Sequence, residues 1–143
     1  MIYRCDKMDS LLHTYYQQQP ILIKVLIAAG ADINATDING QTVLHYTIRH
    51  GRTDTAKLLI NSGADVNSVN GYGQTVLYYA VIYNHSKWAN YLIELLIEKG
   101  ANINAVNNDR KTALHHAVIL GYINTVKLLL EKGADINAAD SDE

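Results

Sequence analysis

The feature that most constrains this chain is an internal repeat. A six-residue string of the type GADINA occurs four times, beginning at Gly30, Gly63, Gly100 and Gly133. Consecutive strings start 33, 37 and 33 residues apart. A second string, Thr-Val-Leu-His or a close variant, begins at Thr42, Thr75 and Thr112, which are 33 and 37 residues apart. Because two independent strings keep one register, we predict an array of similar units, each a single supersecondary element.

Each unit is predicted to contain two short helices. Thr42 precedes an apolar stretch and can accept a hydrogen bond from an unpaired backbone N–H as an N-cap, so a first helix is expected to run to His50, where Gly51 breaks it. A second helix is expected over residues 54–61, and Gly63 stands where a helix end favours a left-handed residue. The Asp- and Asn-rich stretch that follows is typical of an extended turn. Two such helices cannot bury their apolar faces alone, so the units must stack.

The threonine string also carries a family signature. It continues as Thr-Val-Leu-His-Tyr-Thr, Thr-Val-Leu-Tyr-Tyr-Ala and Thr-Ala-Leu-His-His-Ala in the second, third and fourth units. Over nearly its whole length the chain is similar to the ankyrin-repeat family, whose units of about 33 residues carry the signature T-P-L-H-x-A. The signature proline is replaced by Val43, Val76 and Ala113. The resemblance implies an all-α solenoid of stacked helix–turn–helix units with β-turn or hairpin fingers, in which Tyr78, at the histidine position of the third unit, alters one hydrogen bond between units.

We expect a single domain over residues 1–143 with four units. They span about residues 8–36, 37–69, 70–106 and 107–139, followed by a short tail at 140–143. The first unit is degenerate, as terminal units often are because their outer face meets water. The last unit keeps its apolar residues, so either a minimal cap suffices or the chain is part of a longer array.

The third unit carries four extra residues within the stretch 84–90. Four residues make about one helical turn. Apolar residues follow at helical spacing, at Trp88, Tyr91, Leu92, Leu95 and Leu96. We favour a longer second helix whose Trp88 and Tyr91 pack on neighbouring units; the alternative is a protruding, partner-specific element built around Trp88.

Composition excludes several classes of function. Twelve Lys and Arg against fourteen Asp and Glu give a formal net charge of −2, which argues against a nucleic-acid binder or a protein of anionic membranes. The sequence contains no run of eighteen apolar residues, so no membrane span is predicted. A single cysteine, Cys5, indicates a reducing compartment, so an intracellular, cytoplasmic protein is expected. Abundant Ile, Asn and Tyr favour AT-rich coding and an origin in a virus or pathogen, which would place the protein in the host cytoplasm.

No catalytic residue, cofactor or metal site is expected. The resemblance implies a structural role for His45 and His115, which occupy the signature position, and helical geometry points His116 away from His115. The stretch 32–37 superficially resembles a calcium loop but lacks its glycine, and Val43 stands where the bidentate glutamate belongs. Cys5 has no placed histidine partner and is a poor candidate nucleophile.

Binding is instead expected on the concave surface of the solenoid. The resemblance implies contacts from the turn tips and from the exposed ends of the first helices. The turn tips carry Ile38, Asn39 and Gln41, then Gly71, Tyr72 and Gln74, then Asn108, Asp109 and Lys111. The helix ends carry Tyr16 and Gln17, Arg49 and His50, Ile82 and Tyr83, and Ile119 and Leu120.

Apolar residues among these positions predict the centre of an interface. We expect Ile82, Tyr83, Ile119 and Leu120, with Tyr72 nearby, to face water, and polar neighbours to form a rim. The alternative is that Ile82 and Ile119 stack on each other between units and are buried. The function expected is a non-enzymatic adaptor that binds a protein partner, as a monomer or weak homo-oligomer. Alternatives are a targeting or regulatory fragment of a larger protein, or a homo-oligomerising scaffold.

Overall fold

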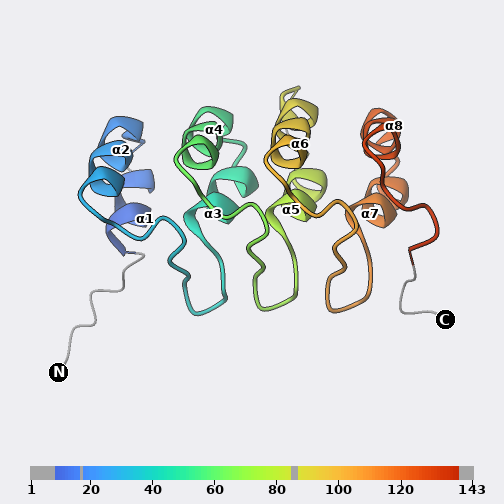
Figure 1. Cartoon of the computed structure of the whole chain (residues 1–143), viewed down its shortest axis with the longest axis horizontal. Coiled ribbons are helices and arrows are strands. Elements are labelled where there is room, and N and C mark those ends of the chain that lie inside the picture. Colours follow the sequence, from blue (N-terminus) through green and yellow to red (C-terminus); the bar gives the residue numbers. More distant parts are fainter. Residues whose placement is uncertain (1–8, 17, 85–86, 139–143) are drawn as a thin grey trace.

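The computed structural model describes residues 9–16, 18–84 and 87–138. Over these residues the chain forms helix pairs arranged in one row, with extended fingers between successive pairs (Figure 1). The helices are α1 Asp9–Tyr16, α2 Pro20–Ala28, α3 Val43–Arg49, α4 Thr53–Asn61, α5 Val76–Ile82, α6 Ala89–Glu98, α7 Ala113–Ile119 and α8 Ile123–Glu131. The predicted all-α solenoid is confirmed.

The helix ends follow from the residues that the repeat places there. The hydroxyl of Thr42 accepts a hydrogen bond from the backbone N–H of His45 at 3.4 Å, and Thr75 and Thr112 cap α5 and α7 in the same way. Gly63 follows α4 with φ +95°, in the left-handed region that glycine adopts most cheaply. The predicted caps and the predicted helix-ending glycine are confirmed, and α4 begins one residue earlier than expected.

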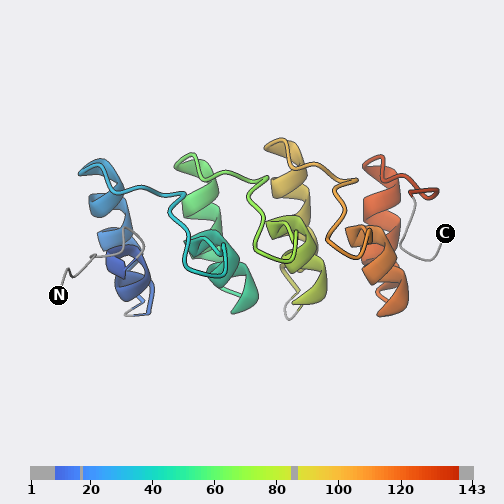
Figure 2. The same cartoon turned by 90° about the horizontal axis from the view of Figure 1, so that it is seen from below.

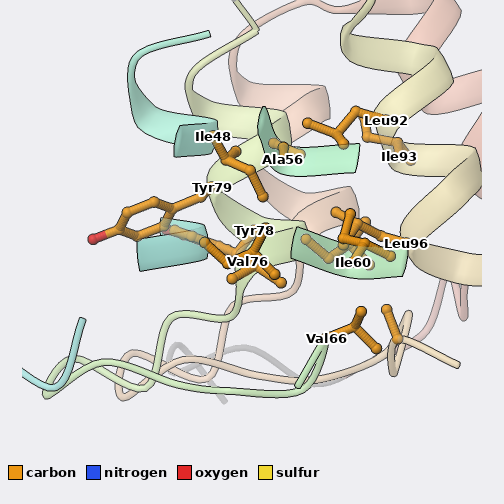
Figure 3. Packing of buried hydrophobic residues seen from close by; sticks show 14 of the residues in the cluster. Ile48, Ala56, Ile60, Val66, Val76, Tyr78, Tyr79, Leu92, Ile93 and Leu96 are labelled. Atoms are coloured by element: carbon orange, nitrogen blue, oxygen red, sulfur yellow. The ribbon is translucent and has the colours of Figure 1, made fainter. Parts of the chain in front are cut away.

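The hydrophobic core lies between units as well as within them. Side chains from α3, α4 and the turn after α4 meet side chains from α5 and α6 of the next unit (Figure 3). The buried residues at this junction include Ile48, Ile60 and Val66 on one side and Val76, Leu92 and Leu96 on the other. Each unit therefore supplies the apolar wall that its neighbour lacks, which is why two short helices suffice.

Backbone hydrogen bonds join the fingers, which span residues 37–41, 70–74 and 107–111. The N–H of Gly71 donates to the carbonyl of Asn39 at 2.9 Å, and the N–H of Asn108 donates to the carbonyl of Tyr72 at 3.0 Å. These bonds place the three fingers side by side below the helices in Figure 1.

A ladder of asparagines joins the turns that follow the second helices. The Oδ1 atom of Asn34 accepts from the N–H of Asp65 in the next unit at 2.8 Å. Asn67 repeats this contact with the N–H of Asn102 at 2.7 Å, and Asn104 repeats it with the N–H of Asp135 at 2.7 Å. The Asn of the GADINA string is thus a connector between units.

The interpretation favoured for the four-residue insertion, a longer second helix with Trp88 and Tyr91 packed on neighbouring units, is confirmed only in part. Helix α6 has 10 residues against 9 in α4 and α8, so most of the insertion lies in the connection before the helix, where residues 85–86 fall outside the described part. Trp88 is the residue before α6 and is about half exposed, with the ammonium of Lys87 at 5.1 Å from its ring. The carbonyl of Trp88 accepts from the N–H of Leu92 at 2.9 Å, so Trp88 stands one helical turn before Leu92, yet it is exposed where Leu92 is buried. Tyr91 is 38% exposed, and Nζ of Lys57 in α4 of the neighbouring unit lies 5.8 Å from its ring centroid, so the predicted contact with a neighbouring unit is found for Tyr91.

No helix in the described part of the chain is both long enough and apolar enough to cross a membrane.

Candidate functional site

The first helices and the fingers form one face of the molecule. Figure 1 shows α1, α3, α5 and α7 in a layer between the second helices and the fingers, and Figure 2, seen from below, shows the fingers in front of α3, α5 and α7. We call this side, made of α1, α3, α5, α7 and residues 37–41, 70–74 and 107–111, the finger face. The repeat thus brings onto one face the two sets of residues that the sequence analysis singled out.

Several of the predicted apolar contact residues are exposed on the finger face. The exposed ones are Tyr16, Ile38, Tyr72, Ile119 and Leu120. The side chain of Ile119 is 64% exposed, so the alternative that Ile82 and Ile119 bury each other is wrong for Ile119. Ile82 is half-buried against the core. Exposed apolar side chains are therefore found both at the tip of the second finger and at the end of α7.

Tyr83 is not fully exposed as expected but half-buried. Its ring packs edge-on against Tyr79 with the ring centroids 5.3 Å apart, and the guanidinium of Arg49 lies 5.7 Å from its ring centroid. Arg49 and His50 are exposed, and the Nδ1 atom of His50 lies 2.8 Å from the hydroxyl oxygen of Tyr15. Tyr83 is therefore held by Tyr79 of its own unit and by Arg49 of the preceding unit.

Two predicted contact residues, Gln41 and Gln74, have side chains that hold the fingers together. Gln41 is buried and its Oε1 atom accepts from the hydroxyl of Tyr79 at 3.0 Å. Gln74 is half-buried and its Oε1 atom accepts from Nδ2 of Asn70 at 2.9 Å. The expectation that both side chains face a partner is therefore corrected: they lie on the inner side of the fingers. Asn39 and Asp109 at the tips are exposed, and Lys111 is half-buried.

Buried polar contacts fix each finger to the helix behind it. The Nδ1 atom of His45 accepts from the backbone N–H of Thr42 at 3.1 Å, which leaves Nε2 as the protonated nitrogen, 3.2 Å from the carbonyl oxygen of Gln74 in the next finger. Tyr78 replaces this histidine in the third unit, and its hydroxyl instead accepts from Nδ2 of Asn107 at 3.1 Å and lies 2.8 Å from Nε2 of His116. The altered bond between units expected at Tyr78 is thus found.

Sequence analysis did not single out Tyr46 of α3, which also lies on the finger face. Its hydroxyl donates to the carboxylate of Asp37 in the first finger, and this hydrogen bond, with burial and the carboxylate charge, raises the pKa of Tyr46 to about 12. Tyr46 precedes Arg49 by one helical turn and occupies the same place in its unit as Tyr79 and His116. Because these three aromatic residues recur at one position of the repeat, the repeat register could have identified them from the sequence.

Stability should fall below neutral pH because of His45, which is buried, and His116, which is half-buried. Burial lowers the pKa of His45 and of His116 below the ordinary value of about 6.5. A lowered folded-state pKa contributes stability above the unfolded pKa, and this stability is lost as pH falls from about 6.5 through the folded pKa. We expect urea midpoints of the wild type to fall between pH 7.5 and pH 5.5, and the fall to be smaller in His45→Gln. An equal fall in both proteins would contradict this role of His45.

No group of three or more His, Cys, Asp or Glu side chains that could hold a metal ion occurs among the described residues. In the stretch that superficially resembles a calcium loop, Oδ1 of Asp32 accepts from the N–H of Asn34 at 3.0 Å, and Oδ1 of Asp37 accepts from the N–H groups of Asn39 and Gln41 at 2.9 Å. Each carboxylate therefore stabilises its own turn. Cys5, Gln17, His85 and residues 140–143 lie outside the described residues.

The stacked helix pairs, the connecting fingers and the face that they form define a repeat solenoid of the class that recognises other macromolecules through an extended surface. A family model described as ankyrin repeats (3 copies) matches residues 11–104 and 92–140. The chain belongs to the ankyrin-repeat family. Ankyrin repeats are protein-interaction modules and typically not enzymes.

The chain is also similar to one curated protein over a short segment. Over 54 residues it is 44% identical to an ADP-ribosylation factor GTPase-activating protein, AGD2, from Arabidopsis thaliana. The segment covers 37% of this chain and 7% of the Arabidopsis protein. The chain therefore spans only a small part of the length of that relative.

Proposed function

We propose that this chain is a non-enzymatic adaptor that binds a protein partner through the finger face. The observation that carries the proposal is the exposure of Tyr72, Ile119 and Leu120 on one face of a folded unit. Exposed apolar side chains that include an aromatic one are the usual composition of an interface centre.

The finger face also carries polar side chains, which we take as the rim of the interface. Arg49 and His50 lie on the side of the second unit, and Asp109 and Lys111 lie on the third finger. Both signs of charge are present, so the rim favours a partner with a mixed polar surface over a nucleic acid or an anionic membrane. Specificity would come from this rim, while affinity would come from the apolar centre.

The proposal is tested with two isoleucines of the last unit that are exposed to a similar degree. Ile119 ends α7 on the finger face and is 64% exposed, whereas Ile123 begins α8 and is 68% exposed. A partner is first recovered by affinity capture and mass spectrometry, and its Kd is then measured by titration. We expect Ile119→Asn to weaken binding about 30-fold, as truncation of a hot spot does, and Ile123→Asn to leave Kd within about twofold.

Tyr72→Ser provides an independent variant on the second finger and should also weaken binding. Both substitutions replace exposed side chains, so the thermal midpoint should change by only a few degrees. Wild-type affinity in both Ile119→Asn and Tyr72→Ser would rule out the finger face. A loss caused by Ile123→Asn alone would place the interface on the second helices.

A second candidate function is that the array is the interaction part of a longer protein, as a targeting or regulatory segment. The match to AGD2 favours it, because the similar segment is 7% of that GTPase-activating protein. An immunoblot of the native cell with an antibody raised against this chain would decide. A band much larger than the chain supports the longer protein, and a band at the size of the chain contradicts it.

The location that best fits the composition is the cytoplasm, or the host cytoplasm if the gene belongs to a virus or pathogen. The single cysteine supports a reducing compartment such as the cytoplasm. The high content of Ile, Asn and Tyr favours AT-rich coding, and so an origin in a virus or pathogen. Imaging of the tagged chain in its native cell tests it, and a signal confined to another compartment would contradict it.

A further inference from the structure

The last helix pair exposes apolar side chains whose equivalents in the earlier units are buried or half-buried. Val118 of α7 is 59% exposed, whereas Val81, at the same place in the third unit, is 0% exposed. Leu130 of α8 and Ile136 in the turn after it are exposed, whereas their equivalents in the second unit, Ile60 and Val66, are buried. We call Val118, Leu130 and Ile136 the trailing face. It is equivalent to the side of the junction in Figure 3 that carries Ile48, Ile60 and Val66, but no described helix pair packs on it.

The first helix pair exposes the other half of the same junction. Leu22 of α2 is 42% exposed, whereas its equivalent in α6, Leu92, is 5% exposed. Val25 is also exposed, whereas its equivalent in α8, Leu128, is buried. We call Leu22 and Val25 the leading face.

The asparagine ladder adds a polar match between the two ends. Each Asn of the ladder accepts from the backbone N–H of the residue that begins the equivalent turn in the next unit, as Asn104 does from Asp135 at 2.7 Å. Asn137 is the next Asn of this series and lies at the trailing end. The residues that donate their N–H to the ladder are Asp65, Asn102 and Asp135. Asp32 is their equivalent in the first unit and lies at the leading end.

We propose that a second copy of this chain stacks head to tail, with its leading face on the trailing face of the first. The contact would repeat a junction that the fold already makes three times, with Leu22 and Val25 packed on Val118, Leu130 and Ile136. The N–H of Asp32 in one copy would donate to Asn137 of the other. This proposal goes beyond binding at the finger face and uses residues on the two ends of the row.

The two faces differ, so the contact is heterologous and leaves one face of each kind open. Association of this kind grows with concentration instead of stopping at a dimer. Packing two trailing faces on each other would instead give a closed dimer, and it would not use the Asn137 to Asp32 match. Continuity with the internal junctions therefore favours the head-to-tail arrangement.

The first measurement is sedimentation equilibrium of the whole chain between about 1 and 200 µM. We expect the weight-average mass to rise from that of one chain past that of two. A mass equal to one chain over the whole range would overturn the proposal. The two end faces would then not bind a second copy of this chain.

Two variants, each blocked at one end, distinguish the arrangements. Leu22→Glu removes the leading face and Leu130→Glu removes the trailing face, so each variant alone should remain monomeric. An equimolar mixture should form a one-to-one dimer that grows no further, because only one junction is possible. Self-association of Leu22→Glu alone would show that two trailing faces pair and would overturn the head-to-tail arrangement.

Ile38→Glu is the matched control, since it makes the same change of charge at an exposed apolar residue of the first finger. It should associate as the wild type does. If Ile38→Glu is as monomeric as the two end variants, added charge and not the end faces explains the result, and the proposal fails.

Discussion

Leu59→Ala is expected to lower the free energy of unfolding by about 2–5 kcal/mol, the usual cost of such a truncation in a core. Leu59 lies in α4 and is fully buried in the core that α3, α4 and α6 share. Because a domain of this size is stable by about 5–15 kcal/mol, the loss should be a large fraction of the total.

The measurement is equilibrium unfolding in urea, followed by circular dichroism, at a concentration low enough to exclude association. Leu120→Ala is the matched control, because Leu120 is 42% exposed at the end of α7. It should cost less than about 1 kcal/mol, as truncation at an exposed position usually does. Similar costs at the two leucines would contradict the core described for α4.

Gly73→Ala should cost about 2–4 kcal/mol, the sum of a backbone effect and a steric one. Gly73 has φ +71°, a conformation that strains any residue with a Cβ atom. A Cβ atom there would lie 2.6 Å from Oδ1 of Asn108 and 3.0 Å from its backbone nitrogen in the next finger. Relief would require the second and third fingers to separate.

Gly51→Ala isolates the backbone effect. Gly51 has φ +69°, but nothing lies within 4 Å of a Cβ atom placed on it, so only strain of about 1–2 kcal/mol is expected. Arg110 is the equivalent of Gly73 in the third finger and has φ +59°. No further finger of the described chain packs beyond it, so a side chain fits there. If Gly73→Ala and Gly51→Ala cost the same by urea unfolding, close packing of the fingers is not what requires glycine at position 73.

Much of the fold was predictable because its signals are local. The threonine caps, the left-handed Gly63 and the two-helix unit each depend on residues within one or two turns of each other, and the repeat shows that every unit uses the same solution. The finger face was predictable in outline, since the register places the fingers and the ends of the first helices on one side. Side-chain direction was not: Ile38 and Gln41 are three residues apart in one finger, and one is exposed while the other is buried.

The sequence by itself determined the repeating unit, its helices and the direction in which units stack, because hydrogen bonds and apolar spacing within about 33 residues encode them. Only the tertiary structure decided which side chains are covered. Val81 and Val118 are the same residue at the same place in neighbouring units, yet one is fully buried and the other is more than half exposed. The difference lies in whether another helix pair is packed beyond them, because burial belongs to the junction between units and not to the residue.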